Sequence, residues 1–288
     1  MKTDVILVNS FTSNGAGGNP AGVVLNADML SDAQKLSIAQ AVGYSETAFV
    51  CRDDEADFEV SFFTTTGEVD FCGHATLAVF STLFQEGIVA AGGYIQKTKA
   101  GLLAVVVEPT GHVIMDLQLP QKLGKFSYEA ISDVIGIDSA ILASTRLPIE
   151  IISTGLTDLI IPVPMGYLDS IIPNDIAISD FCRTHDVVGF HVFELCDAES
   201  PLTASCRNFA PLVGISEESA TGSATGALAC YFAEHLPLDC HYVVEQGRAM
   251  GCTSMLTASV ELNGSKISSV KVGGSASRIG TSIYSNVE

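Results

Sequence analysis

The sequence has few basic and aromatic residues and no tryptophan. Its 288 residues contain 14 Lys and Arg against 33 Asp and Glu, a formal net charge of −19, and only 7% are aromatic. Such acidity disfavours nucleic acid and anionic membranes, so we expect neither as a partner. No apolar run approaches the roughly 20 residues that span a bilayer, and the first residues lack the apolar core of a signal peptide. We therefore expect a cytoplasmic protein.

Zinc-binding cysteine pairs and a hydrolase nucleophile motif are also absent. The eight cysteines are scattered without any C-x-x-C spacing, so the sequence predicts no metal site and free thiols in a reducing compartment. No G-x-S-x-G elbow occurs. The hydrophobic content of 47% is that of a folded protein, and the length is sufficient for two domains.

A strand pattern leads directly into a helix pattern in the first half. Apolar and polar residues alternate over 58–64, and the Ala- and Leu-rich segment 74–86 that follows is too long for a strand. Residues 72–74 therefore begin a helix, where unpaired N–H groups and the helix dipole favour an anion. Gly73 would allow a ligand to approach the backbone.

The second half repeats this arrangement. Thr221-Gly-Ser-Ala-Thr225 aligns without a gap with Cys72-Gly-His-Ala-Thr76, and again precedes an apolar helix. Both helices are apolar on most faces, so we expect each to be buried by a curved sheet of six or seven strands. A two-layer sandwich is the alternative. Two related lobes with a site between them are the resulting hypothesis.

The expected elements follow from periodicity, Gly and Pro turns and capping residues. Helices are predicted from a Ser31–Gln34 capping box to Gly43, and over 74–86, 127–136, 174–185 and 223–235. Strands are predicted near 5–11, 21–25, 47–52, 58–64, 93–98, 102–108, 112–119, 148–153, 158–163, 189–195, 203–209, 241–247, 255–262, 266–272 and 276–284. The last strand has no place in the repeat, and we expect it to return to the first lobe.

Two residues of the first half are candidates for proton transfer. Glu46 opens an apolar strand, where burial would raise its pKa and make it a general acid or base; the alternative is a solvated loop glutamate. His74 is either a helix-capping residue or a substrate ligand and proton shuttle, and the helix dipole would lower its pKa.

The remaining candidates each have a structural alternative. Cys72 is either a thiol base or a buried structural residue. Asp70 and Glu68 are either site carboxylates or turn residues. In the second half, Thr221, Ser223 and Thr225 either bind the substrate or cap the helix. Glu217 and Glu218 are either site carboxylates or acids of the first helical turn.

Motifs along nearly the whole chain resemble the PhzF-like (phenazine biosynthesis-like) isomerase and epimerase family. They are Gly18-Asn-Pro-Ala21, Ser45-Glu-Thr-Ala-Phe-Val50, Asp70-Phe-Cys-Gly-His-Ala-Thr76, Thr221-Gly-Ser-Ala224, Glu245-Gln-Gly247 and Val272-Gly-Gly-Ser-Ala276. The resemblance implies an α+β, diaminopimelate epimerase-like fold of two pseudo-symmetric lobes, each a mixed sheet around a central helix. We expect lobes at 1–122, completed by 276–288, and at 123–275.

The resemblance also implies a function. It is cofactor-free proton transfer next to the carboxylate of a small substrate, in the cleft between the lobes of a homodimer. Glu46 matches the family's acid/base glutamate. The family's carboxylate-binding helix ends correspond to Gly73 and His74 and to Gly222 and Ser223, and Asn19 lies near the cleft.

The chain departs from the family pattern in a few places. Glu218-Ser219 stands where Asp-Pro is usual, and Cys252 where an Arg commonly follows Met-Gly. Two-cysteine racemases of this fold have Cys at the positions of both Cys72 and Thr221, and only the first is present here. The alternatives to a Glu46 isomerase are therefore a Cys72-based epimerase or dehydratase and a catalytically idle metabolite-binding protein.

Overall fold

A computed structural model describes residues 2–285, which divide into two compact units. Unit 1 comprises the described residues up to Asp116 and from Gly273 onward, and unit 2 comprises Leu117–Val272. Among residues 2–285, no helix is both long enough and apolar enough to cross a bilayer.

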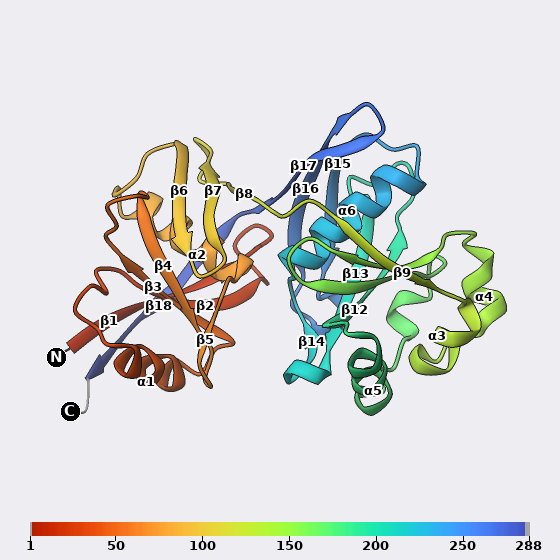
Figure 1. The fold of residues 1–288 in the computed structure, drawn as a ribbon, viewed down its shortest axis with the longest axis horizontal. Coiled ribbons are helices and arrows are strands. Elements are labelled where there is room, and N and C mark those ends of the chain that lie inside the picture. Colours follow the sequence, from red (N-terminus) through yellow and green to blue (C-terminus); the bar gives the residue numbers. More distant parts are fainter. Residues whose placement is uncertain (1, 286–288) are drawn as a thin grey trace. The chain divides into compact units, whose positions relative to one another are not determined.

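Unit 1 is a mixed sheet with two helices (Figure 1). Its elements are β1 (Lys2–Ser10), β2 (Asn19–Val24), α1 (Asp32–Val42), β3 (Glu46–Cys51), β4 (Phe58–Phe63), β5 (Glu68–Val69), α2 (Gly73–Gln85), β6 (Gly92–Thr98), β7 (Gly101–Val107), β8 (Val113–Asp116) and β18 (Ala276–Ser285). The pairing order is β18–β1–β2–β3–β4–β6–β7–β8, with β5 on β4. The pairs β2/β3 and β4/β6 are parallel, and the others are antiparallel.

Helix α2 is the centre of unit 1. Ten of its 13 residues are buried, and it contacts β1, β2, β3, β7, β8 and β18, so strands surround it as its apolar composition predicts. Helix α1 begins with the predicted Ser31–Gln34 capping box and ends at Gly43 in the left-handed conformation. It packs with Val5 and Phe49 in a separate apolar cluster.

Unit 2 repeats the arrangement. Its elements are β9 (Gln121–Phe126), α3 (Tyr128–Ile135), α4 (Ser139–Ser144), β10 (Ile149–Ser153), β11 (Thr157–Pro162), η1 (Leu168–Ser170), α5 (Asp175–His185), β12 (Gly189–Leu195), β13 (Ala204–Ala210), η2 (Pro211–Val213), β14 (Ile215–Glu218), α6 (Gly222–His235), β15 (His241–Gln246), η3 (Arg248–Met250) and β16 (Ser254–Asn263), followed by β17 (Lys266–Gly274). The order β9–β10–β11–β12–β13–β15–β16, with β14 on β13, matches the order β18–β1–β2–β3–β4–β6–β7, with β5 on β4, strand for strand. Its parallel pairs, β11/β12 and β13/β15, occupy the corresponding places.

Helix α6 takes the place of α2, with ten buried residues and contacts to β10, β11, β15 and β16. Helices α3, α4 and α5 cover the other sheet face through one apolar cluster that includes Ile131, Leu142, Ile178 and Phe190. Strand β9 and helix α4 were not predicted. Strand β9 is largely exposed and lacks apolar alternation, and α4 has only six residues.

Candidate active site

Three side chains of different chemistry meet in unit 1. Oε2 of Glu46 lies 3.2 Å from Nε2 of His74, and Sγ of Cys72 lies 3.4 Å from Nδ1 of the same ring. Only 16% of the Glu46 side chain and 6% of the His74 side chain are exposed. The strand start and the helix start identified from sequence thus bring their candidate residues into contact.

Local structure explains this meeting. Glu46 is the first residue of β3, which pairs in parallel with β2, and His74 is the second residue of α2. Ser10 at the end of β1 donates from Oγ to the His74 carbonyl at 2.6 Å. Around the ring, Asn19 Nδ2 lies 3.4 Å from Nδ1, and Ser45 Oγ lies 3.4 Å from Nε2. Contacts from several strands therefore fix the imidazole plane.

The three groups set one another's protonation. Burial acts to raise the pKa of Glu46, but His74, Ser45 and Cys72 bring it below its ordinary value. Burial acts to lower the pKa of His74, but Cys72 and Glu46 raise it well above its ordinary value. Burial and the Glu46 charge raise the pKa of Cys72. These directions favour a carboxylate at Glu46, a protonated ring at His74 and a protonated thiol at Cys72.

Both pKa directions expected from sequence, upward for Glu46 and downward for His74, are wrong. The expectations considered burial and the helix dipole alone. For the His74 pKa, the contacts with Cys72 and Glu46 outweigh burial and the dipole, and for the Glu46 pKa the contacts with His74, Ser45 and Cys72 outweigh burial.

The start of α2 is open toward a ligand. Its N-cap residue, Cys72, is extended and forms no side-chain capping hydrogen bond. A Cβ added at Gly73 would approach only Met115 Sδ at 3.5 Å and Phe71 Cε1 at 4.0 Å, which are ordinary contact distances. Packing therefore does not require glycine at this position.

Unit 2 has a matching helix start. Thr221 is the extended N-cap of α6 and, like Cys72, makes no side-chain capping bond. Its hydroxyl instead donates to Glu218 Oε2 at 2.5 Å and accepts from Gln246 Nε2 at 3.1 Å. Gln246 also donates to the Glu218 carbonyl and accepts from the Thr221 N–H. Gln246, which is fully buried, thus fixes the backbone that leads into α6.

The Glu245-Gln-Gly247 motif has a physical explanation here. Gly247 has φ +84°, and a Cβ there would lie 2.4 Å from the Cys252 carbonyl oxygen and 3.0 Å from that of Ser219. Only glycine permits this approach of two backbone segments beside the start of α6. Gln246 was not singled out from sequence, because its role depends on contacts distant along the chain.

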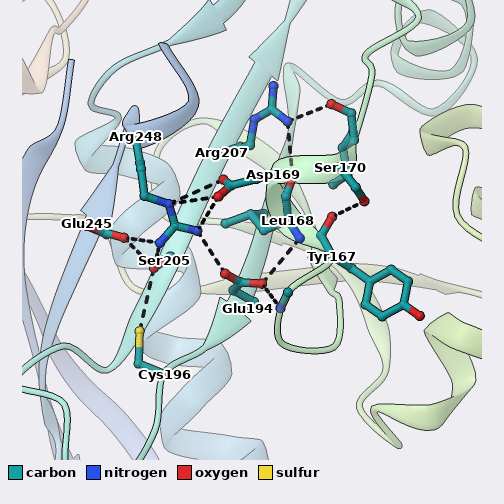
Figure 2. A network of polar contacts seen from close by, with 12 residues as sticks. Tyr167, Leu168, Asp169, Ser170, Glu194, Cys196, Ser205, Arg207, Glu245 and Arg248 are labelled. Carbon is teal, nitrogen blue, oxygen red and sulfur yellow. Dashed lines mark hydrogen bonds and ion pairs between the residues drawn. The ribbon is translucent and has the colours of Figure 1, made fainter. Parts of the chain in front are cut away.

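An ion-pair network follows the motif. Figure 2 shows the Arg248 guanidinium among Asp169, Glu194 and Glu245, with nitrogen–oxygen distances of 3.0, 3.0 and 2.6 Å. Glu194 also accepts from the backbone N–H groups of Gly166 and Leu168. The network fixes the segment directly after Gln246 to β12 and to the loop before α5.

Several predicted site residues lie elsewhere or have structural partners. Asp70 is exposed, and Glu68 pairs with Lys99. Glu217 forms a two-pronged ion pair with Arg207, with both distances 2.8 Å. The first-turn interpretation of Glu217 and Glu218 is wrong, because both belong to β14 and α6 begins at Gly222.

A buried acid near Glu218 was missed. Asp158 on β11 is 2% exposed, and its Oδ2 has no hydrogen-bond partner among residues 2–285. Burial and the Glu218 charge raise its pKa to about 7. A carboxyl group so placed is mostly protonated below neutral pH and ionises as the pH rises past it. In the sequence, Asp158 is recognisable only as an acidic residue at the start of an apolar strand.

Comparisons with known proteins identify the family of this chain. The family model described as phenazine biosynthesis-like protein matches residues 8–281. The chain belongs to this family. An uncharacterized isomerase of Clostridium acetobutylicum is 31% identical over 96% of this chain and 95% of its own. The trans-2,3-dihydro-3-hydroxyanthranilate isomerase of Pseudomonas chlororaphis is 27% identical over 96% of each chain. The chain is accordingly an isomerase.

Solved structures show the same fold. A PhzF-family protein of Bacillus anthracis superposes with a TM-score of 0.89 at 27% identity, covering 99% of this chain and all of that one. A hydroxyproline epimerase of Agrobacterium vitis, at 10% identity and a TM-score of 0.65, shares the fold over 98% of this chain and 91% of its own. The predicted α+β, diaminopimelate epimerase-like fold is confirmed.

Proposed function

We propose that this isomerase moves a proton on a small carboxylate-bearing metabolite without a bound cofactor, with Glu46 as the acid and base. The contact that carries this proposal is the 3.2 Å approach of Glu46 to His74, beside a helix start that no side chain caps. Asn19, Gly73 and His74 would hold the substrate carboxylate at that helix start.

The charges of Glu46 and His74 indicate how the proton would move. Glu46, ionised in the free protein, would take the proton from carbon, and the α2 start would stabilise the enolate-like charge that develops. Glu46 would then return this proton to another carbon or face. Because its pKa is lowered by His74 in the free protein, substrate binding has to raise it. The substrate's own negative charge and the exclusion of water both act in that direction.

The substrate class is supported by the Pseudomonas relative, whose name specifies a dihydro-hydroxyanthranilate, a non-aromatic ring that carries a carboxylate. In unit 2, the open start of α6 supports a second carboxylate-binding position at Gly222 and Ser223, with Glu218 and Thr221 as accessory groups. A homodimer and a cytoplasmic location stay predictions, and sedimentation equilibrium would test the first.

Isotope exchange tests the proposal. Candidate carboxylic acids, including dihydrohydroxyanthranilates and amino acids, would be incubated with the protein in heavy water, and deuterium incorporation followed by mass spectrometry. Glu46→Gln keeps the side-chain shape and removes the base, so exchange should fall by at least about 100-fold.

Cys72→Ala is the matched comparison, because Cys72 touches the same ring but is a neutral thiol in the free protein. It should retain most of the exchange rate. A loss as deep as that in Glu46→Gln would transfer the role of base to the thiol, and undiminished exchange in Glu46→Gln would reject the mechanism.

A further inference from the structure

The three side chains of the unit 1 site form a set of metal donors. One ligand atom from each of Glu46, Cys72 and His74 lies within 4.8 Å of the other two. They offer a carboxylate oxygen, a sulfur and an imidazole nitrogen, all of which zinc accepts. The sequence argument against a metal considered only C-x-x-C spacing, whereas these donors come from a strand start and a helix start.

The separations approach those of ligands on one ion. With Zn–N and Zn–O near 2.0–2.1 Å and Zn–S near 2.3 Å, tetrahedral ligand atoms lie roughly 3.3–3.6 Å apart. Glu46 Oε2 lies 3.2 Å from His74 Nε2. Sγ of Cys72 lies 3.4 Å from Nδ1 and 3.9 Å from Nε2 of the same ring, so the Cys72 side chain has to rotate toward Nε2 to share an ion with Glu46.

The second observation concerns hydrogen bonding to Oε2 of Glu46. Oε2 is buried and, within the described part of the chain, accepts no hydrogen bond of good geometry, although the imidazole is close. The adjacent protonated ring stabilises this oxygen by charge, without a well-aligned hydrogen bond. A metal ion between oxygen and nitrogen would supply a directed interaction in place of that charge.

The surroundings suit a bound metal. Nδ1 of His74 lies 3.4 Å from Nδ2 of Asn19. Turning this amide about its last side-chain bond would place its oxygen to accept the Nδ1 proton when Nε2 binds metal. A thiolate–imidazole pair selects zinc over magnesium or calcium.

We propose that Glu46, Cys72 and His74 bind one zinc ion, with the fourth position left to water. Binding removes the thiol proton of Cys72 and, where His74 is protonated, its proton as well, so affinity rises with pH. Zinc binding is independent of the proposed function. Inhibition follows from it and rests on that function, because the metal occupies the carboxylate that would accept the substrate proton.

Zinc chloride titrated calorimetrically into chelator-treated protein tests the site. We expect one ion per chain, and at least about tenfold weaker binding in both Cys72→Ser and Glu46→Gln. Cys51→Ser is the matched control, because Cys51 is the last residue of the strand that Glu46 begins, and its half-buried thiol should not contribute. Thermal unfolding without metal identifies any variant that fails to fold.

Cobalt(II) provides a second readout. A thiolate–cobalt charge-transfer band should appear in the parent and in Cys51→Ser, and be absent in Cys72→Ser. Binding of parental affinity in folded Cys72→Ser and Glu46→Gln, or no stoichiometric binding to the parent, would overturn the site. If zinc binds as expected but isotope exchange persists at saturation, the inhibition is refuted. Failure of the proposed function would instead appear as absent exchange without metal.

Discussion

Replacing Glu46 by Gln should lower the pKa of His74. Opposite charges 3.2 Å apart attract by about 5 kcal/mol at an effective dielectric constant near 20. That figure is a ceiling, because water reaching the 16% exposed carboxylate weakens the attraction. We therefore expect the His74 pKa to fall in the variant, and burial then favours the neutral ring.

The same pair predicts how stability depends on pH. The raised His74 pKa contributes stability that is complete below its unfolded value near 6.5 and is lost as pH rises through the folded value. The lowered Glu46 pKa contributes stability that is complete above 4.5 and is lost as pH falls through the folded value. Both contributions are complete between these limits, so Glu46→Gln should cost most stability near pH 5.5 and less at both acidic and alkaline pH.

Nitrogen-15 NMR of the histidine rings across pH measures the effect directly. His191 is an internal control, because it lies in unit 2 and burial lowers its pKa to about 4. Its titration should be the same in parent and variant. If His74 titrates at the same pH in folded Glu46→Gln as in the parent, the contact does not control its charge and the electrostatic reasoning fails.

Three further predictions concern unit 2. Gly247→Ala should cost at least about 2 kcal/mol in urea unfolding, because backbone atoms of Cys252 and Ser219 block the new methyl group; an unchanged midpoint would contradict this. Burial raises the Asp158 pKa to about 7, so the parent should lose stability relative to Asp158→Asn as pH rises from about 4 to 7, by up to about 4 kcal/mol. A pH-independent difference would be inconsistent with a buried acid. Gly222→Val should fold but lose affinity for carboxylates, and calorimetry showing intact binding would argue against that helix start.

The fold could be predicted because its signals are local. Capping at Ser31, apolar alternation and the two apolar helices each follow from neighbouring residues, and the order of motifs carried the family resemblance. Strand β9 was not predicted because its exposed residues show no apolar periodicity.

The site could be predicted only in part. Glu46 and His74 were each identified, but their contact and hence their charges depend on how β3 is placed against α2. Two further features likewise depend on tertiary structure. They are the ion pair of Glu217 with Arg207 and the hydrogen bonds of Gln246 to Thr221, and no spacing in the sequence predicts them.

Strand β18 has a consequence for how the chain is made. It pairs along β1 from Lys2 to Ser10, so unit 1 is assembled from two segments separated by the whole of unit 2. During synthesis, the continuous unit 2 can complete its sheet while unit 1 still lacks an edge partner for β1. Until residues 276–285 emerge, the backbone groups of β1 on that side stay unpaired and open to pairing with other chains. The residues that hold Glu46 and His74 would then reach their final setting only late in translation, after unit 2 has been synthesised.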